Sequence, residues 1–506
     1  MSLKLFGKNA VIYAIGNVGL RAVAFLLIPL YTHSLAMRDY GLLMTLLLTN
    51  EFMLIPMNCG MRLALVRFAK EYEKDNRISA LLGTSCFLNV LAGLVVAGVS
   101  LTLLVPVFRS VLHSENVYPY ICLVCSISLL QSICIHLMDY YRAQNKSVKF
   151  MITGLVSAGI LLIASYILLF ILHMGTMGAL WARIAAYAII LLPISFDIFS
   201  KTGIRISFNL IPELARFGFP LVFSMSSELI IVGASVYLLS IFSGLEAVAI
   251  YSLGQKLATV LAIALILPFQ MSFQPFIFAN LDNPNIKKQM SQLLTYLLLA
   301  ISVASFCILF GSRLLLPYIA PPAYSSAYSV ILLLLPGMAF IGIYYFAETL
   351  LTTVRQTHII GLTMTACAVF SVILNYMLIR FLNQYGAIIA TNVCYMLAGS
   401  SLFIIGRKKF PVPFESRRLC IAIGLFLAVI LLNLVLLKVN NSTYYLASIM
   451  AVCAIGCVLH FGSFYNEQEK KLFENAVKRV KTNLPGFLRR SGPLDTLSFT
   501  QEDDNK

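Results

Sequence analysis

The feature that most limits the fold of this chain is a series of apolar runs, each about 20 residues long, that recurs along most of its length. Hydrophobic residues make up 59% of the 506 residues and charged residues only 11%, and the mean hydropathy is +0.88. Soluble proteins carry about 25% charged residues. Runs of this length suit membrane-spanning helices, whereas barrel strands alternate apolar and polar residues over about 10 positions. The chain is therefore predicted to be an all-α integral membrane protein.

Fourteen spans are predicted, with short connections between them. They cover residues 9–31, 41–61, 81–105, 117–140, 150–172, 178–199, 215–241, 247–270, 290–310, 326–350, 359–379, 385–405, 418–437 and 444–462. The predicted domains are an N-terminal lobe of spans 1–6 (residues 1–200) and a C-terminal lobe of spans 7–12 (residues 201–405). Two extra helices (406–462) and a cytoplasmic tail (463–506) follow.

A weak internal repeat supports two six-helix lobes. Residues 39–68 read D-Y-G-L-L-M, a long apolar run and then R-F, and residues 246–276 read E-A-V-A-I-Y, a long apolar run and then P-F. A repeat unit with an even number of helices relates the halves by an axis along the membrane normal. Because transporters with such halves bind substrate near the midplane, the repeat predicts a cavity between the two lobes.

The net charge of +16 is distributed as in a membrane protein rather than a nucleic-acid-binding protein. With the N-terminus on the cytoplasmic side, 29 Lys and Arg residues fall on that side, 5 on the other and three inside spans. This asymmetry predicts that both termini are cytoplasmic. Residues 470–484 have the pattern of a basic amphipathic helix suited to anionic membrane lipids. No nucleic-acid partner is predicted.

Three basic residues lie within otherwise apolar spans: Arg21 in span 1, Arg183 in span 6 and Lys256 in span 8. A charge at membrane depth is costly and is usually retained facing a partner or a water-filled cavity. Arginine binds phosphate as a bidentate fork and lysine binds it as a point charge. The three residues are therefore predicted to line a cavity that binds an anionic substrate.

Acidic and neutral polar residues accompany these cations. Glu51, Glu228 and Glu348 are interpreted as counter-charges or coupling-ion sites. The polar cavity face is predicted to consist of Tyr13, Asn17, Ser252, Thr259 and Tyr344, which lie at helical spacing from Arg21, Lys256 or Glu348. The alternative is that the charged residues form buried structural pairs, such as Glu51 with Arg21.

Sequence motifs for the common catalytic chemistries are absent. The chain has no G-x-x-x-x-G-K-[ST] motif, no H-E-x-x-H motif and no loop long enough for a soluble active site. The cysteines lie in apolar spans and are attributed to packing. We therefore predict no catalytic residue, no metal and no cofactor, and the scattered histidines are given no role.

Several segments resemble the polysaccharide flippases of the multidrug/oligosaccharidyl-lipid/polysaccharide (MOP) superfamily. In the first half the similar segments are K-N-A-V-I-Y-A-I-G-N (8–17), F-L-L-I-P-L-Y-T-H-S-L (25–35), D-Y-G (39–41) and R-F-A-K-E-Y (67–72). In the second half they are R-F-G-F-P-L-V-F-S (216–224), I-Y-S-L-G-Q-K-L-A (250–258) and P-F-I-F (275–278). The resemblance covers roughly residues 8–405.

This resemblance implies two six-helix lobes in a V shape, often with two extra C-terminal helices, around a cation-lined cavity. It implies flipping of a polyprenyl-diphosphate-linked oligosaccharide, such as an O-antigen unit, across a bacterial or archaeal inner membrane by alternating access. Arg21 and Lys256 match basic sites of the family. The chain reads G-A-S-V-Y (233–237) where many relatives have an S-D-R-like segment, so either Glu228 supplies the acid or ion coupling differs.

The implied partners are the lipid-linked oligosaccharide, membrane lipids and the polysaccharide polymerase machinery. Two transport functions of the same fold remain as alternatives. One is export of drugs or small cations, which favours an acidic cavity. The other is flipping of lipid II.

Overall fold

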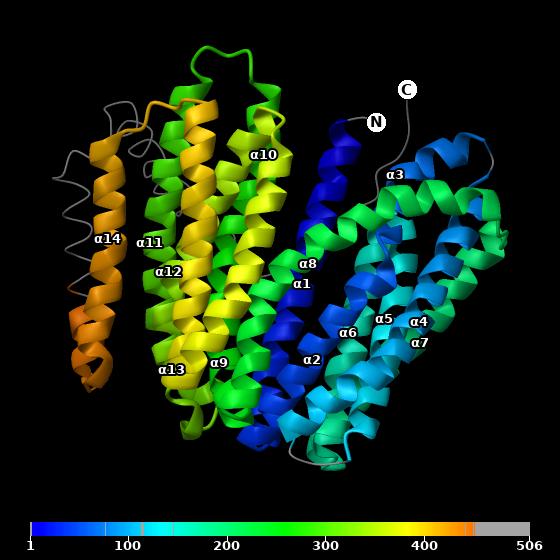
Figure 1. The fold of residues 1–506 in the computed structure, drawn as a ribbon, viewed down its shortest axis with the longest axis horizontal. Helices are drawn as coiled ribbons and strands as arrows, with labels where there is room; N and C mark the ends of the chain where they lie inside the picture. The colour runs from blue at the N-terminus through cyan, green and yellow to red at the C-terminus, as the bar shows by residue number, and fades with distance from the viewer. Residues whose placement is uncertain are drawn as a thin grey trace, which may run out of the picture. The chain divides into compact units, whose positions relative to one another are not determined.

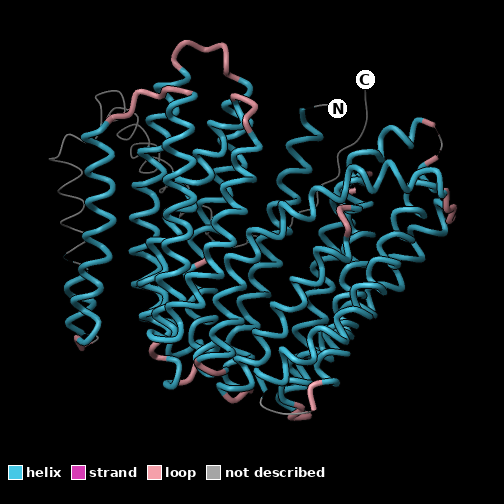
Figure 2. The backbone as a smooth tube through the Cα atoms, viewed as in Figure 1, coloured by secondary structure: helices cyan, strands magenta, loops and turns pink. Residues whose placement is uncertain are grey.

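The computed structural model describes residues 3–75, 77–112, 116–144, 146–440, 442–448 and 450. The chain divides into two compact units, Met1–Leu437 and Lys438–Lys506. All the elements discussed below belong to the first unit. In the described residues every regular element is a helix (Figure 2).

The first group of helices runs to residue 202 and is drawn in blue to cyan and blue-green in Figure 1. It contains α1 (Leu3–Ser34), α2 (Met37–Asn58), α3 (Met61–Lys74), α4 (Ile78–Leu112), α5 (Tyr118–Ala143), α6 (Ser147–Tyr166) with the π-helix η1 (Ile167–Ile171), and α7 (Gly175–Thr202). Helix α5 packs against α2, α4 and α7, and α6 packs against α1 and α7. These helices share an apolar core that includes Leu65, Leu82, Leu137 and Ile194, and Leu210 and Leu214 of the following segment also belong to it.

The second group follows and is drawn in green to orange in Figure 1. It contains η2 (Phe208–Leu210), α8 (Ile211–Phe242), α9 (Leu245–Ala258), η3 (Ala262–Ile266), α10 (Leu267–Ala279), α11 (Ile286–Ile319), η4 (Pro322–Tyr324), α12 (Ala327–Thr353), α13 (Thr357–Lys409) and α14 (Ser416–Val435). Helix α13 packs on α8 and α12, and α14 packs on α11. Asn383 breaks α13 with φ 49° and ψ −130°, so this helix contains the predicted spans 359–379 and 385–405.

The prediction of an all-α, multi-span membrane protein is confirmed. Ten helices within the described residues are long and apolar enough to cross a membrane. Most of the fourteenth predicted span and all of the tail lie outside the described residues. The predicted lobe limits at residues 200 and 405 do not coincide with the boundary between the two units, and they stay a prediction.

The structure differs from the predicted spans at two places. Residues 62–80, expected as a connection, contain the amphipathic helix α3, which buries Ala64, Leu65 and Ala69. The predicted span 247–270 is regular only as far as Ala258, and the π-helix η3 separates α9 from α10. Pro268 at the start of α10 has no amide hydrogen, so the regular hydrogen-bond ladder cannot pass through it.

Helix α2 connects the two groups through close backbone approaches. A Cβ atom on Gly41 would lie 1.8 Å from the carbonyl oxygen of Leu245 at the start of α9. Gly60, with φ of 70°, follows the other end of α2, and a Cβ atom there would lie 2.3 Å from the Cα atom of Gly218 in α8. Only glycine fits these positions, so α2 packs on the second group at both of its ends.

Candidate functional site

Arg21, Arg183 and Lys256 line the same cavity, which has a volume of about 700 Å³. They come from three helices, α1, α7 and α9, and Glu51 joins them from α2. We call this space the cationic cavity. Its apolar lining includes Phe25, Leu27, Ile28, Met44, Leu47, Leu48, Val236 and Val260. Within the described residues, three cations and one carboxylate therefore face a largely apolar space.

Arg21 is held by a backbone group that the π-helix leaves free. In η3 the amide of Leu267 donates to the carbonyl of Ala262, five residues earlier. The carbonyl of Ile263 would need the amide of residue 268 in the same pattern, but that residue is proline. The Arg21 Nη1 donates to this oxygen at 2.7 Å. The contact fixes Arg21 at the cavity and joins α1 to the second group.

The other two cations keep unused binding capacity. The Nε of Arg183 and the hydroxyl of Ser252 are buried, and neither has a hydrogen-bond partner among the described residues. Lys256 Nζ lies 5.7 Å from the ring centroid of Tyr40, a cation–π distance. The ring orients the ammonium without neutralising it. Because buried polar groups are normally hydrogen-bonded, these groups point to a ligand that would complete the cavity.

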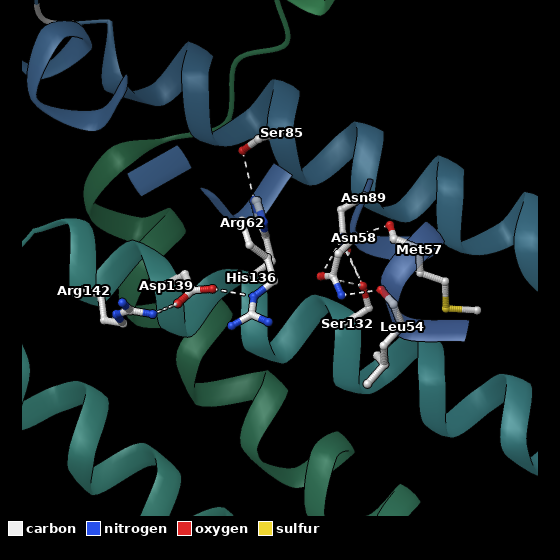
Figure 3. Close-up of polar contacts among 10 residues, drawn as sticks. All are labelled: Leu54, Met57, Asn58, Arg62, Ser85, Asn89, Ser132, His136, Asp139 and Arg142. Carbon is white, nitrogen blue, oxygen red and sulfur yellow. Dashed lines mark hydrogen bonds and ion pairs between the residues drawn. The ribbon is translucent and has the colours of Figure 1, made fainter. Parts of the chain in front are cut away.

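A second cavity, of about 510 Å³, adjoins the first. Its charged lining residues are Glu51, Arg62, Asp139, Arg142 and Glu228, so we call it the mixed-charge cavity. Arg62 Nε donates to Asp139 Oδ2 at 2.6 Å, and Arg142 Nη1 donates to Asp139 Oδ1 at 3.1 Å (Figure 3). Asp139 therefore fixes both guanidinium groups at the cavity surface. Glu51 and Val232 line both cavities.

A buried polar stripe on α5 leads to Asp139. It consists of Ser128, Gln131, Ser132, His136 and Asp139, which are all buried. Ser128, Ser132, His136 and Asp139 follow one another at steps of four, four and three residues, and Gln131 lies three residues after Ser128. Gln131 Oε1 accepts from Asn50 at 2.9 Å, Ser132 Oγ accepts from Asn89 at 2.9 Å, and His136 Nε2 lies 3.0 Å from Ser85 Oγ. Figure 3 shows the part of this network near Asp139.

This stripe was not among the predicted site residues, and no role was predicted for His136. Four members of the stripe are uncharged at neutral pH, and Asp139 lies at the end of the predicted span 117–140, so the stripe does not stand out as a charge within a span. Their spacing of three and four was the signal that could have found them. Within the described residues, no three His, Cys, Asp or Glu side chains lie together as a metal site requires.

Three further predicted residues, Glu348, Thr259 and Tyr344, are not among the lining residues of either cavity. Glu348 accepts a hydrogen bond from Gln270 Nε2 at 3.0 Å and lines neither cavity. Thr259 donates to Gln255 O within its own helix at 2.7 Å, and Tyr344 stacks edge-on against Tyr345. The side chains of Tyr13 and Asn17 lie outside the described residues. The ion pairs of the described residues do not include Glu51 with Arg21.

Solved structures similar to this one are membrane transporters. The lipid II flippase MurJ in an inward closed conformation has a TM-score of 0.65 and 14% identity, over 90% of this chain and 100% of that chain. An inward-facing multidrug resistance MATE family transporter has a TM-score of 0.62 and 14% identity, over 77% and 94%. A MOP superfamily transporter from Pyrococcus furiosus, described by the reverse polarity of its binding pocket, has a TM-score of 0.57 and 14% identity, over 79% and 95%. These likenesses confirm the MOP transporter fold.

Comparison of the sequence itself gives the family. No curated protein matches the chain. Residues 6–281 match the family model described as polysaccharide biosynthesis protein. This segment is more than half of the 506 residues, and the solved structures agree with it in fold. The chain is a multi-pass membrane protein that belongs to the polysaccharide biosynthesis protein family.

Proposed function

We propose that this protein flips a polyprenyl-diphosphate-linked oligosaccharide, such as an O-antigen repeat unit, across the cytoplasmic membrane by alternating access. The observation that carries the proposal is that Arg21, Arg183 and Lys256 line a single cavity with one carboxylate. Membership of the polysaccharide biosynthesis family supports the substrate class. The diphosphate would bind in the cationic cavity.

The cations address the main energetic barrier to flipping. A diphosphate carries at least two negative charges, and the hydrocarbon core is about 30 Å thick. Moving such a group without its hydration shell is prohibitive. Cations placed in advance replace that shell and need little reorganisation, and the prenyl chain can remain in lipid. Glu51 would offset the cations when the cavity is empty, and Glu228 and Glu348 would act as further counter-charges or bind a coupling ion.

The proposal also includes the orientation of the protein and its partners. The excess of Lys and Arg on one side of the predicted spans supports cytoplasmic termini in a bacterial or archaeal inner membrane. The flipped lipid-linked unit would then become available to a polysaccharide polymerase. No catalytic step is assigned to the chain itself.

Lipid II flipping is the second candidate, since the MurJ structure is similar and lipid II also has a polyprenyl diphosphate. The cationic cavity fits either lipid. Export of cationic drugs, suggested by the likeness to MATE transporters, is less compatible with three cations facing one acid.

Flipping by the purified protein in liposomes tests the proposal. The probe is a fluorescent undecaprenyl-diphosphate oligosaccharide, and lipid II and a cationic dye are assayed in parallel. We expect Arg21→Gln and Lys256→Gln to abolish flipping and Arg21→Lys to retain part of it, because lysine keeps the charge without the bidentate fork. Arg109→Gln, at an exposed residue outside both cavities, is the matched control.

Three results would count against this function. Flipping that survives the loss of all three cations would overturn the role of the cationic cavity. Preference for lipid II would favour the second candidate, and transport of the dye alone would favour an exporter.

A further inference from the structure

We propose that the mixed-charge cavity binds the sugars of the lipid-linked oligosaccharide while the diphosphate occupies the cationic cavity. This inference rests on the proposed function. It assigns the two parts of one headgroup to two adjoining spaces with different chemistry.

The two cavities adjoin along α2. Glu51 of α2 and Val232 of α8 line both of them. From Glu51 the mixed-charge cavity extends along α2 to Asn58, seven residues further, which is about 10 Å of helix. A headgroup held by its diphosphate beside Glu51 therefore lies next to the mixed-charge cavity.

The charge balance separates the two cavities. The mixed-charge cavity has two cations, Arg62 and Arg142, and three carboxylates, from Glu51, Asp139 and Glu228. The described residues that line it therefore provide no excess of positive charge with which to hold a diphosphate. Sugar hydroxyls are neutral, and each of them can both donate and accept a hydrogen bond. A surface that offers guanidinium donors beside carboxylate acceptors matches that chemistry.

The guanidinium groups in this cavity are held in place by Asp139, yet they have further nitrogens that can donate to a ligand. Asp139 is 3% exposed and binds only Nε of Arg62 and Nη1 of Arg142. The two arginine side chains remain 34% and 48% exposed, so their other nitrogens are accessible. Glu228 takes part in no ion pair recorded for the described residues. Leu54, Ile55, Leu63 and Leu229 complete the lining with apolar surface suited to the C–H faces of sugar rings.

Binding of two lipids that differ only in sugar number tests the assignment. The probes are undecaprenyl diphosphate carrying one N-acetylglucosamine and undecaprenyl diphosphate carrying chitotetraose, and Kd is measured with the purified full-length protein by native mass spectrometry. Glu228→Gln removes a charged acceptor. Leu63→Trp fills the cavity from a residue that is already 45% exposed. Leu91→Trp, at a residue on α4 that is 46% exposed and lines neither cavity, is the matched control.

We expect Glu228→Gln to raise the ratio of the tetrasaccharide-lipid Kd to the monosaccharide-lipid Kd by about tenfold, the value of one charge-assisted hydrogen bond. Leu63→Trp should raise the same ratio, because the indole occupies space that the additional sugars need. Leu91→Trp should leave both Kd values unchanged. Lys256→Gln should raise the Kd of both lipids by the same factor.

The outcomes separate this inference from the function on which it rests. If Glu228→Gln and Leu63→Trp raise the Kd of both lipids by the same factor, or change neither Kd, the mixed-charge cavity is not a sugar site. If Glu228→Gln weakens the binding of both lipids equally and the loss depends on pH or Na⁺, Glu228 is a coupling residue instead. If the wild-type protein binds neither lipid, or if Lys256→Gln changes neither Kd, the proposed function itself fails.

Discussion

The two cavities differ in how their cations are partnered. In the mixed-charge cavity, Asp139 binds both arginines. In the cationic cavity, the Nε of Arg183 has no partner among the described residues, and Lys256 lies over an aromatic ring. A paired cation can be explained by structure alone, whereas an unpaired one at membrane depth destabilises the empty protein. This difference is the basis of our proposal that the unpaired cations bind the charged part of the ligand, while the paired ones present fixed donors to a neutral part.

The largest effect is expected at Gly41, where α2 approaches α9 beside the cationic cavity. Gly41→Ala places a Cβ atom 1.8 Å from the carbonyl oxygen of Leu245, so the two helix backbones must separate. We expect loss of about 3 kcal/mol of stability, the upper range for overpacking, together with loss of transport. Thermal unfolding in detergent measures the first effect. Gly98→Ala, where nothing lies within 4 Å, should be neutral.

An intermediate effect is expected from breaking the partnered cluster of the mixed-charge cavity. Asp139→Asn leaves Arg62 and Arg142 without their shared carboxylate. Because both arginines are partly exposed and can gain water, we expect a loss of about 1–2 kcal/mol, less than for a fully buried pair.

Glu71→Gln is the control for this cluster, since it breaks an exposed i,i+4 pair with Arg67, which is worth about 0.5 kcal/mol or less. Equal melting temperatures for the two variants would mean that Asp139 does not organise the mixed-charge cavity.

The smallest effect is expected at Glu51, which lines both cavities. Among the described residues, Glu51 is the one carboxylate in the lining that the three cations share. Its removal by Glu51→Gln should let undecaprenyl diphosphate bind about three- to tenfold more tightly. Transport should slow, because release of the headgroup becomes harder. Weaker binding of this sugar-free lipid would show that Glu51 contacts the ligand or supports the fold, and does not oppose the diphosphate.

The residues that could be predicted from the sequence are those whose charge contrasts with an apolar span. Arg21, Arg183 and Lys256 stood out for that reason, and the structure brings them to one cavity. Their contacts could not be predicted. The Arg21 contact depends on a carbonyl 242 residues away, which is free only because Pro268 meets a π-helix. Glu348 stood out for the same reason, but it accepts a hydrogen bond from Gln270 and lines neither cavity, so its role as a counter-charge or coupling-ion site stays a prediction.

Binding of the sugar-free lipid also shows whether the three cations hold the diphosphate. Kd of undecaprenyl diphosphate is compared for the wild-type protein, the Arg21→Gln/Arg183→Gln/Lys256→Gln triple variant and the Arg109→Gln control, with unfolding temperatures measured alongside. We expect the folded triple variant to bind at least about a hundredfold more weakly, equivalent to about 2.7 kcal/mol, while the control binds like the wild type. A folded triple variant with the wild-type Kd would contradict the claim that these three cations hold the diphosphate.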